Sequence, residues 1–281
     1  MLRFPMTSTA VNFVYQYSYW LAILVILVAS LYQISISHSA RFASYFQGRG
    51  TVLIVFAHPD DEVMFFLPAI LALKARGHNI ITACLSTGNA DGIGSLRAVE
   101  FRRVMAQLRL SKFYIMDSIQ LPDGFHAWNS DSVRTEIEKV LVDNPDVDTI
   151  MTFDKGGVSG HPNHVSVRAG VGAVLLGRES TDAPRRRTSP RLAKSQSSAF
   201  KNLTVLELVT VPLWLKYAVP PMDLLFQSSE DLAVTNWSLD ASRLMRLYES
   251  QNVWFRQLFS LFSRYAYVNT FKVIIAGDHT R

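Results

Sequence analysis

The stretch VLIVFAHPDDE, residues 52–62, decides the fold that the sequence predicts. Six apolar residues lead directly into a histidine, a proline and three acidic residues. A short apolar run of this kind is typical of a strand at the centre of a parallel sheet, buried on both faces. Adjacent carboxylates repel one another and resist burial, so we expect them at the end of the strand, where a bound cation can offset their charge.

Four later segments are also short and apolar, and stretches with helical character separate them. Strands that alternate with helices predict an α/β fold, a Rossmann-like and mostly parallel sheet with helices on both faces. We expect one such domain over residues 51–281. Its stretch 242–271 is rich in aromatic residues and is expected to be helical, packed on the domain or lying at a membrane surface. The four segments are 79–87, 112–118, 147–154 and 202–209.

Composition narrows the class of protein. The chain has 281 residues, of which 49% are hydrophobic, so it can bury a sizeable core. Its formal net charge of +5 suits an anionic membrane surface or a phosphorylated ligand, and it is too small to indicate nucleic acid. Cys84 is the single cysteine. No disulfide can form within the chain, which favours a reducing compartment.

The amino-terminal region contains a segment suited to a membrane. Residues 11–36 carry no Asp, Glu, Lys or Arg, and they are about long enough to cross a hydrocarbon core of ~30 Å as a helix. We therefore expect a short tail at 1–12, a transmembrane anchor at 13–36 and a linker at 37–50. Aromatic residues flank the most apolar part, as in an interfacial belt: Tyr15, Tyr17, Tyr19, Trp20 and Tyr32.

The role and orientation of this segment leave alternatives open. A signal peptide also begins with an apolar stretch, and LVAS at 27–30 is a weak cleavage site. Arg3 precedes the span, whereas Arg41 and Arg49 follow it. Basic residues favour the cytosolic side of a membrane, so this small excess after the span predicts a cytosolic domain.

Residues 177–198 differ in composition from the rest of the chain. They contain almost no large apolar side chains and many Arg, Ser and Pro. This composition predicts a flexible basic loop on the surface of the domain. A basic patch that faces a membrane is the alternative interpretation of the same residues.

Polar loops follow three of the predicted strands. Residues 58–62 follow the first, GNADG at 88–92 follows the second, and residues 153–164, FDKGGVSGHPNH, include and follow the end of the fourth. Ligands of parallel α/β sheets bind outside the carboxyl ends of the strands, so these loops should converge at one edge. Imidazole and carboxylate groups suit a borderline divalent cation, above all zinc. Three protein ligands with one open position would make the site catalytic rather than structural.

Five motifs in this order support a more specific interpretation. The first four resemble those of the zinc-dependent N-acetylglucosaminyl de-N-acetylases, the LmbE-like superfamily. Within it, the amino-terminal span, the second and fourth motifs and the tail motif are similar to those of the eukaryotic N-acetylglucosaminylphosphatidylinositol de-N-acetylases, the PIG-L type. The resemblance covers about residues 51–271, with 177–198 as an insertion. The motifs are AHPDDE at 57–62, GNADGIG at 88–94, RAVEF at 97–101, GGVSGHPNH at 156–164 and SQNVWFRQLFSLFSRY at 250–265.

The resemblance implies a catalytic centre built on one metal ion, zinc in first place, with other divalent cations left open. His58, Asp61 and His164 would bind the metal. Asp60 would be the general base that takes a proton from the attacking water. His161 would stabilise the oxyanion and could protonate the leaving amine. His161 and His164 lie about one helical turn apart, so both can face one cavity.

The same resemblance implies contacts outside the metal. Arg97 would contact the phosphate of the inositol-phosphate part of the substrate, and Glu100 would position Arg97 or the sugar. Asn89 would contact the substrate or simply stabilise a turn. Asn163 would orient a neighbouring histidine. Asp154 would either orient a ligand histidine or end its strand.

Three further residues are less closely tied to the chemistry. Glu62 is expected to interact with the dipole at a helix start. Asp91 is equally well explained as a turn residue. Tyr248 and Glu249 precede Ser250 in the tail motif, where many members of the family carry a histidine. The effect of that difference on substrate contact stays open.

The implied function is hydrolysis of the acetamide group of N-acetylglucosaminyl-phosphatidylinositol, the second step of GPI-anchor biosynthesis. A lipid substrate accounts for a membrane span. We therefore expect a single-pass protein of the endoplasmic reticulum membrane, whose partners are that lipid and the membrane and not nucleic acid. Two alternatives stay open. One is de-N-acetylation of another N-acetylglucosaminyl conjugate, and the other is a catalytically silent, membrane-anchored interaction protein.

Overall fold

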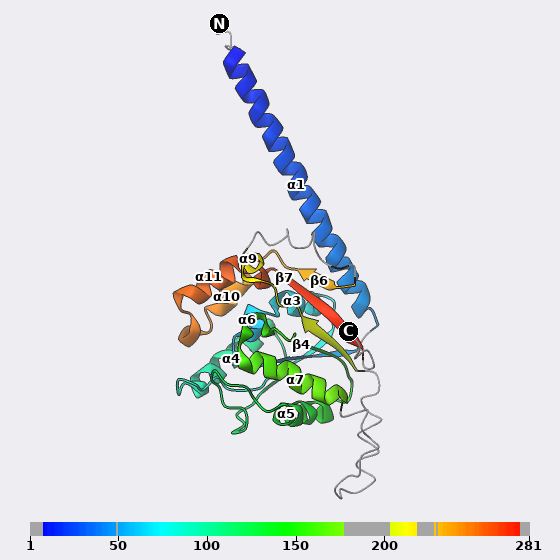
Figure 1. Cartoon of the computed structure of the whole chain (residues 1–281), viewed down its shortest axis with the longest axis vertical. Coiled ribbons are helices and arrows are strands. Elements are labelled where there is room, and N and C mark those ends of the chain that lie inside the picture. Colours follow the sequence, from blue (N-terminus) through cyan, green and yellow to red (C-terminus); the bar gives the residue numbers. More distant parts are fainter. Residues whose placement is uncertain (1–7, 49, 177–202, 218–227, 229, 276–281) are drawn as a thin grey trace, which may run out of the picture.

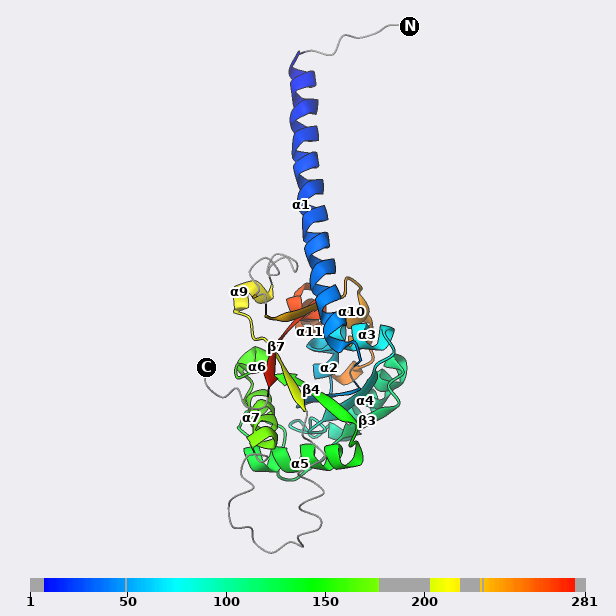
Figure 2. The ribbon, with the colours of Figure 1, turned by 90° about the vertical axis from the view of Figure 1, so that its right-hand side faces the viewer.

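The computed structural model describes residues 8–48, 50–176, 203–217, 228 and 230–275 (Figure 1). The predicted basic loop at 177–198 lies outside the described residues. A long helix, α1, extends from a domain in which helices surround a twisted sheet, and Figure 2 shows the same arrangement from the side.

The sheet of the described residues has the strand order β3-β2-β1-β4-β5-β7-β6. The five strands that the sequence predicts are present and pair in parallel. The strand β1 lies at the middle of this parallel part and is fully buried, as its apolar run predicts. The parallel strands are β1 (Thr51–Phe56), β2 (Asn79–Cys84), β3 (Lys112–Ile115), β4 (Val147–Phe153) and β5 (Thr204–Leu208).

Two antiparallel strands complete the sheet, and one of them corrects a prediction. The strand β7 (Val268–Ile275) pairs antiparallel with β5 and with β6 (Leu232–Thr235). We expected helix up to residue 271. The stretch from Val268 onward is instead rich in β-branched residues, which suit a strand, and pairing with β5 provides hydrogen-bond partners for its backbone. The sheet is therefore mostly parallel, as predicted.

Helices cover both faces of the sheet, which confirms the predicted fold class. The helices α5 and α7 pack against each other on one face, and α3 packs on the other with the carboxy-terminal helices near it (Figure 2). Pro68 lies in the first turn of α3, and the helical stretch after β1 is divided into α2 and α3. The longer helices are α3 (Leu67–Ala75), α4 (Gly94–Leu108), α5 (Ser130–Asp143), α7 (Pro162–Leu176) and α11 (Trp254–Phe262).

Short helical turns connect these elements. Several of them carry residues of the site described below, because they follow directly on the ends of strands. These turns are α2 (Asp61–Met64), α6 (Gly157–Gly160), α9 (Leu213–Lys216), α10 (Asp240–Met245), η2 (Glu249–Gln251) and η3 (Arg264–Ala266).

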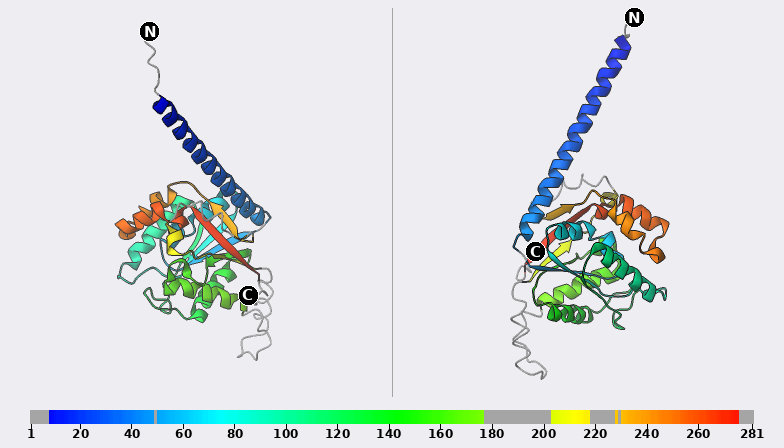
Figure 3. Two further views of the ribbon diagram at one scale, coloured as in Figure 1. Left: turned by 45° about the horizontal axis from the view of Figure 1, so that its top comes forward. Right: turned by 180° about the vertical axis from the view of Figure 1, so that it is seen from behind.

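The helix α1 spans Ser8–Phe46, so most of the expected linker at 37–50 is helical. Its last turns pack on the domain, because Phe42 and Phe46 are fully buried in the core and the Ser35 hydroxyl lies 2.7 Å from that of Thr235. The rest of the helix projects away from the domain (Figure 3). It is long and apolar enough to cross a membrane by length and composition.

Candidate active site

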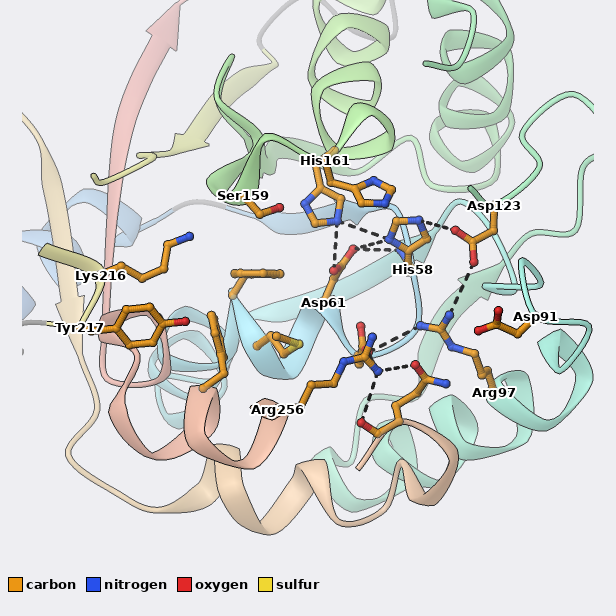
Figure 4. A pocket seen from close by; sticks show the side chains of 16 residues that line it. His58, Asp61, Asp91, Arg97, Asp123, Ser159, His161, Lys216, Tyr217 and Arg256 are labelled. Atoms are coloured by element: carbon orange, nitrogen blue, oxygen red, sulfur yellow. Dashed lines mark hydrogen bonds and ion pairs between the residues drawn. The ribbon is translucent and has the colours of Figure 1, made fainter. Parts of the chain in front are cut away.

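A cavity of about 440 Å³ opens at the carboxyl ends of the parallel strands (Figure 4). The loop after β1 forms its floor, and the loops after β2, β3 and β4 contribute further walls. The tail helix α11 and the turn α9 close the remaining sides. Charged and imidazole groups line the cavity: His58, Asp60, Asp61, Asp91, Arg97, Asp123, His161, His164, Lys216 and Arg256.

Two buried imidazoles face each other across a short gap. His164 Nδ1 lies 3.1 Å from the carbonyl oxygen of Gly157, which makes Nδ1 the donor and leaves a lone pair on Nε2. His58 Nε2 lies 2.9 Å from the side-chain oxygen of Asn163 and 3.0 Å from Asp123 Oδ1, so His58 keeps its lone pair on Nδ1. The two free nitrogens are 3.4 Å apart. Lone pairs opposed in this way suit a shared cation.

The carboxylate of Asp61 completes this group. Its Oδ1 lies 3.3 Å from His164 Nε2 and its Oδ2 lies 3.7 Å from His58 Nδ1. The backbone N–H groups of Ala57 and His58 donate to Oδ2 and fix the side chain at the start of α2. Burial opposes ionisation, but His164 and His58 hold the pKa of Asp61 well below its ordinary value. The residues present therefore fit a divalent cation held by two imidazoles and one carboxylate.

Asp123 places a second carboxylate, in addition to that of Asp61, beside His58. Burial favours the neutral form of His58, but Asp123 and Asp61 raise its pKa above the ordinary value. Burial likewise opposes ionisation of Asp123, yet its contact with His58 lowers the pKa of Asp123 to about 2. The two carboxylates thus favour positive charge on and beside His58, which is the field that a bound cation requires.

Asp60 has a left-handed backbone, with φ of 103°. A non-glycine residue in this region costs on the order of 1–3 kcal/mol and is commonly retained at functional sites. Its Oδ2 lies 3.0 Å from a guanidinium nitrogen of Arg256 and 3.6 Å from one of Arg97. Burial raises the pKa of Asp60, and the charges of Arg256 and Arg97 oppose that shift. The result is a buried carboxylate next to the group of His58, Asp61 and His164.

His161 lies at the mouth side of the histidine pair, and its ring is 5.0 Å from that of His58 and 5.2 Å from that of His164. The backbone N–H of Asn163 donates to its Nδ1, so the neutral ring carries its proton on Nε2. Burial, followed by the charges of His58 and His164, lowers the pKa of His161 to about 4. Burial and these charges therefore favour the neutral form of the His161 ring.

His161 also allows a second metal-binding arrangement. Nitrogen atoms of His58, His161 and His164 all lie within 4.8 Å of one another. Either His161 or Asp61 can thus supply the third ligand beside the two buried imidazoles.

The residues expected to bind substrate are largely engaged with the protein. Arg97 lines the cavity, but its guanidinium donates to the carbonyl oxygens of Gly88 and Pro59. Glu100 accepts from both the backbone N–H and the hydroxyl of Ser250, so it anchors the tail motif to α4. Asn89 accepts from the backbone N–H of Gly94 at the start of α4 and lies outside the cavity. These contacts hold loops of the site in place, and substrate contact by Arg97, Glu100 and Asn89 stays a prediction.

Asp154 has the strand-ending role that the sequence left open. Its carboxylate accepts from the backbone N–H of Gly156 and from both the N–H and the hydroxyl of Thr210. These contacts hold the loop after β4, whose Gly157 carbonyl in turn orients His164. Asp154 therefore acts on the histidine only through the backbone, whereas Asn163 contacts His58 directly.

The sequence analysis did not identify three charged residues of the cavity: Asp123, Lys216 and Arg256. Asp123 follows β3 within the segment DGFH at 123–126. Arg256 lies in the tail motif, which we quoted without assigning a role to its arginine. The signal for Asp123 was its place after a predicted parallel strand, as for the other site residues. The contact between Arg256 and Asp60 joins residues almost 200 positions apart, and no local pattern predicts it.

Glu62 lies at a helix start, as expected, and it is also buried. The hydroxyl of Tyr248 donates to its side chain. The backbone N–H of Asp60 donates to its other oxygen. Burial, only partly offset by these hydrogen bonds, raises the pKa of Glu62 to about 8. The tyrosine in place of the expected tail histidine therefore stabilises a buried carboxyl beneath the site.

Replacing Tyr248 by Phe should destabilise the protein by about 1–3 kcal/mol, because a buried carboxyl loses its donor. The loss should be larger at pH 9 than at pH 6. The pKa of Glu62 is raised from its ordinary value of 4.5 to about 8 in the folded state, so its carboxyl is ionised in the folded protein at pH 9 but not at pH 6. A buried carboxylate depends more on a hydrogen-bond donor than a neutral carboxyl does. Thermal unfolding of the full chain in detergent measures this. The matched control is Tyr267→Phe, whose hydroxyl donates at an exposed position. Equal, small losses in both variants would contradict the role of Tyr248.

Comparison with known proteins agrees with this site. Residues 53–175 match the family of GlcNAc-PI de-N-acetylases, PIG-L. The N-acetylglucosaminyl-phosphatidylinositol de-N-acetylase of Bos taurus is 32% identical over 230 residues, covering 79% of this chain and 83% of the relative. The enzyme of the same name from Saccharomyces cerevisiae is also 32% identical, over 248 residues that cover 78% of this chain and 80% of the relative.

Solved structures share the fold at much lower identity. The N,N'-diacetylchitobiose deacetylase of Pyrococcus horikoshii superposes with a TM-score of 0.55 at 16% identity, covering 82% of this chain and 86% of that protein. The protein TT1542 of Thermus thermophilus superposes with a TM-score of 0.52. The resemblance that the sequence motifs indicate is thereby confirmed, and the chain belongs to the GlcNAc-PI de-N-acetylase family.

Proposed function

We propose that this protein removes the acetyl group of N-acetylglucosaminyl-phosphatidylinositol, giving glucosaminyl-phosphatidylinositol and acetate in the second step of GPI-anchor biosynthesis. The observation that carries the proposal is the opposed pair of lone pairs on His58 and His164, with the charged carboxylate of Asp61 beside them and that of Asp60 next to it. Relatives that share most of this chain are named for this reaction.

His58, Asp61 and His164 would hold one divalent cation, and zinc is the ion that two imidazoles and a carboxylate favour. When bound, the ion acts as a Lewis acid on the amide carbonyl and makes water a nucleophile at neutral pH. The surrounding residues keep the ligands in place. Asn163 and Asp123 hold His58, and the Gly157 carbonyl holds His164.

Asp60 is the proton carrier of the reaction. Its carboxylate takes a proton from the attacking water, whose oxygen forms a bond to the carbonyl carbon of the acetamide. When the carbon–nitrogen bond breaks, Asp60 returns this proton to the nitrogen. The products are a free amine on the sugar and acetic acid, which loses its proton to solvent to give acetate. Burial keeps the Asp60 carboxylate basic, while Arg256 and Arg97 hold it in position.

His161 stabilises the negative charge that develops on the carbonyl oxygen. Its Nε2–H is the free donor, because Nδ1 already accepts from the backbone of Asn163. A neutral imidazole with a pKa of about 4 donates a hydrogen bond and is a poor source of a proton at pH 7. In the proposed reaction His161 therefore donates to the oxyanion, and Asp60 protonates the amine.

Residues 13–36 of α1 would anchor the protein by crossing the endoplasmic reticulum membrane once. The catalytic domain would then lie in the cytosol. The length and apolar composition of α1 support the span. The excess of arginine after it supports the orientation. An anchor of this kind keeps the site close to a substrate that never leaves the bilayer.

Acetate release from N-acetylglucosaminyl-phosphatidylinositol tests the proposal with full-length protein in detergent. We expect release that a chelator abolishes and zinc restores, together with about one metal ion per chain. Metal-loaded protein without release would favour a different acetamido sugar conjugate as substrate. Protein that binds no metal and releases no acetate would favour a silent interaction protein.

A further inference from the structure

Most large apolar side chains of α11 face away from the core of the domain, unlike those of a helix on the surface of a water-soluble domain. Phe259 and Ser260 face the core, whereas Trp254, Phe255 and Leu258 face outward, with Leu261 and Phe262 beyond them. Trp254 is 73% exposed. Surface helices normally turn such a stripe toward the core and polar residues toward water. The outward stripe of α11 therefore indicates an apolar surrounding.

The turn α9 adds a second apolar patch next to this stripe. Leu213 and Trp214 are each 71% exposed at the tip of the turn. The ring of Tyr217, which follows α9, packs edge-on against that of Phe259 in α11, so the two elements lie side by side. We call the exposed side chains of Leu213, Trp214, Trp254, Phe255, Leu258 and Phe262 the apolar rim.

The rim lies on the side of the domain from which α1 emerges. Figures 1 and 2 agree in placing α9 and α11 at that end and α5 at the opposite end. Where α1 meets the domain, the indole N–H of Trp237 donates to the Ser35 hydroxyl at 3.0 Å, and this indole is itself partly exposed. Tryptophan at such a level is typical of the boundary between lipid and water.

The rim also borders the cavity. Lys216 and Tyr217 at the end of α9, and Arg256 and Phe259 in α11, line the cavity wall, while their neighbours Trp214 and Trp254 face outward. The same two elements therefore present apolar groups to the outside and cations to the inside. An amphiphile with an anionic headgroup and acyl chains matches that division.

We propose that the apolar rim inserts into the surface of the lipid bilayer that α1 crosses, so that the mouth of the cavity opens at the level of the lipid headgroups. This inference deepens the proposed function, since it states how a lipid-linked sugar reaches the site while its acyl chains stay in the membrane. Membrane contact thus comes from two separate parts of the chain, the anchor and the rim, and the rim orients the domain on the surface.

Fluorophores attached at single cysteines in the full chain test this directly. Cys84 is buried, so a cysteine-reactive dye can be directed to Trp254→Cys or Leu258→Cys. The control is Val142→Cys, an exposed apolar position on α5 at the far end of the domain. In phosphatidylcholine vesicles containing nitroxide-labelled lipids, we expect blue-shifted emission and strong loss of fluorescence at 254 and 258, and neither at 142. Equal behaviour at all three positions would overturn the proposal.

A second measurement separates this inference from the proposed function. The double variant Trp254→Ser, Phe255→Ser should raise the KM for the substrate in vesicles roughly tenfold or more. Its activity on water-soluble N-acetylglucosaminyl-inositol phosphate should stay unchanged. An equal loss on both substrates would mean that the stripe is structural, against the proposal. If the wild-type protein were inactive on both substrates, only the proposed function would be contradicted. The fluorescence quenching would still test whether the rim inserts into the bilayer.

Discussion

Replacing Asp60 by Asn should lower the rate of acetate release by roughly 10²–10⁴-fold, the range that a general acid–base group contributes. Asparagine has nearly the shape of aspartate but cannot take a proton from water or return one to the amine. Metal content should stay at the wild-type level, because the Asp60 carboxylate pairs with Arg256 and Arg97, whereas that of Asp61 lies against the two histidines. Acetate release and metal analysis on the same preparation provide the measurement.

The expectation depends on the surroundings of Asp60. Burial raises its pKa, while Arg256 at 3.0 Å and Arg97 at 3.6 Å keep the carboxylate form accessible. An exposed aspartate would be a weaker base and would not need two guanidinium groups to hold it. Asp143→Asn, at the exposed end of α5, is the matched control and should behave like wild type. If Asp60→Asn kept more than about a tenth of the activity, the base would have to be another group.

The parallel part of the fold was predictable because its signals are local. The apolar run of β1 and the polar residues that follow it are adjacent in the chain, and the same pairing recurs after β2 and β4. The carboxyl ends of parallel strands share one edge. That rule alone brings His58, Asp61, His161 and His164 together without knowledge of the strand order.

The carboxy-terminal part was less predictable because its contacts are long-range. The sequence of the tail predicts helix, so β7 was not predicted. Its strand conformation depends on pairing with β5, which lies more than 60 residues earlier in the chain. Tyr248 meets Glu62 across 186 positions, and Ser250 meets Glu100 across 150. The sequence predicted only a helix-start acid at Glu62 and a contact with Arg97 or the sugar at Glu100. The tail covers both acids only once it packs on the rest of the domain. The same packing brings Arg256 to Asp60.

The second large expected effect is loss of the metal ion when its third ligand, Asp61, is replaced. Asp61→Asn should abolish stoichiometric metal binding and lower activity as far as chelation does. It removes the negative charge and leaves one side-chain oxygen for the backbone N–H groups of Ala57 and His58, so the loop can keep its conformation. His161→Ala should instead retain the metal and lower kcat by roughly 10²–10³, as loss of an oxyanion donor does.

Geometry favours Asp61 over His161 as that ligand. The Asp61 carboxylate is buried between the two imidazoles and ionised, with its Oδ1 3.3 Å from His164 Nε2. The His161 ring is only half-buried, and its Nδ1 is occupied by the backbone of Asn163. Zinc content per chain and kcat, measured on both variants, separate the two arrangements. If His161→Ala lost the metal and Asp61→Asn kept it, the three histidines would be the ligands, and the oxyanion would need another donor.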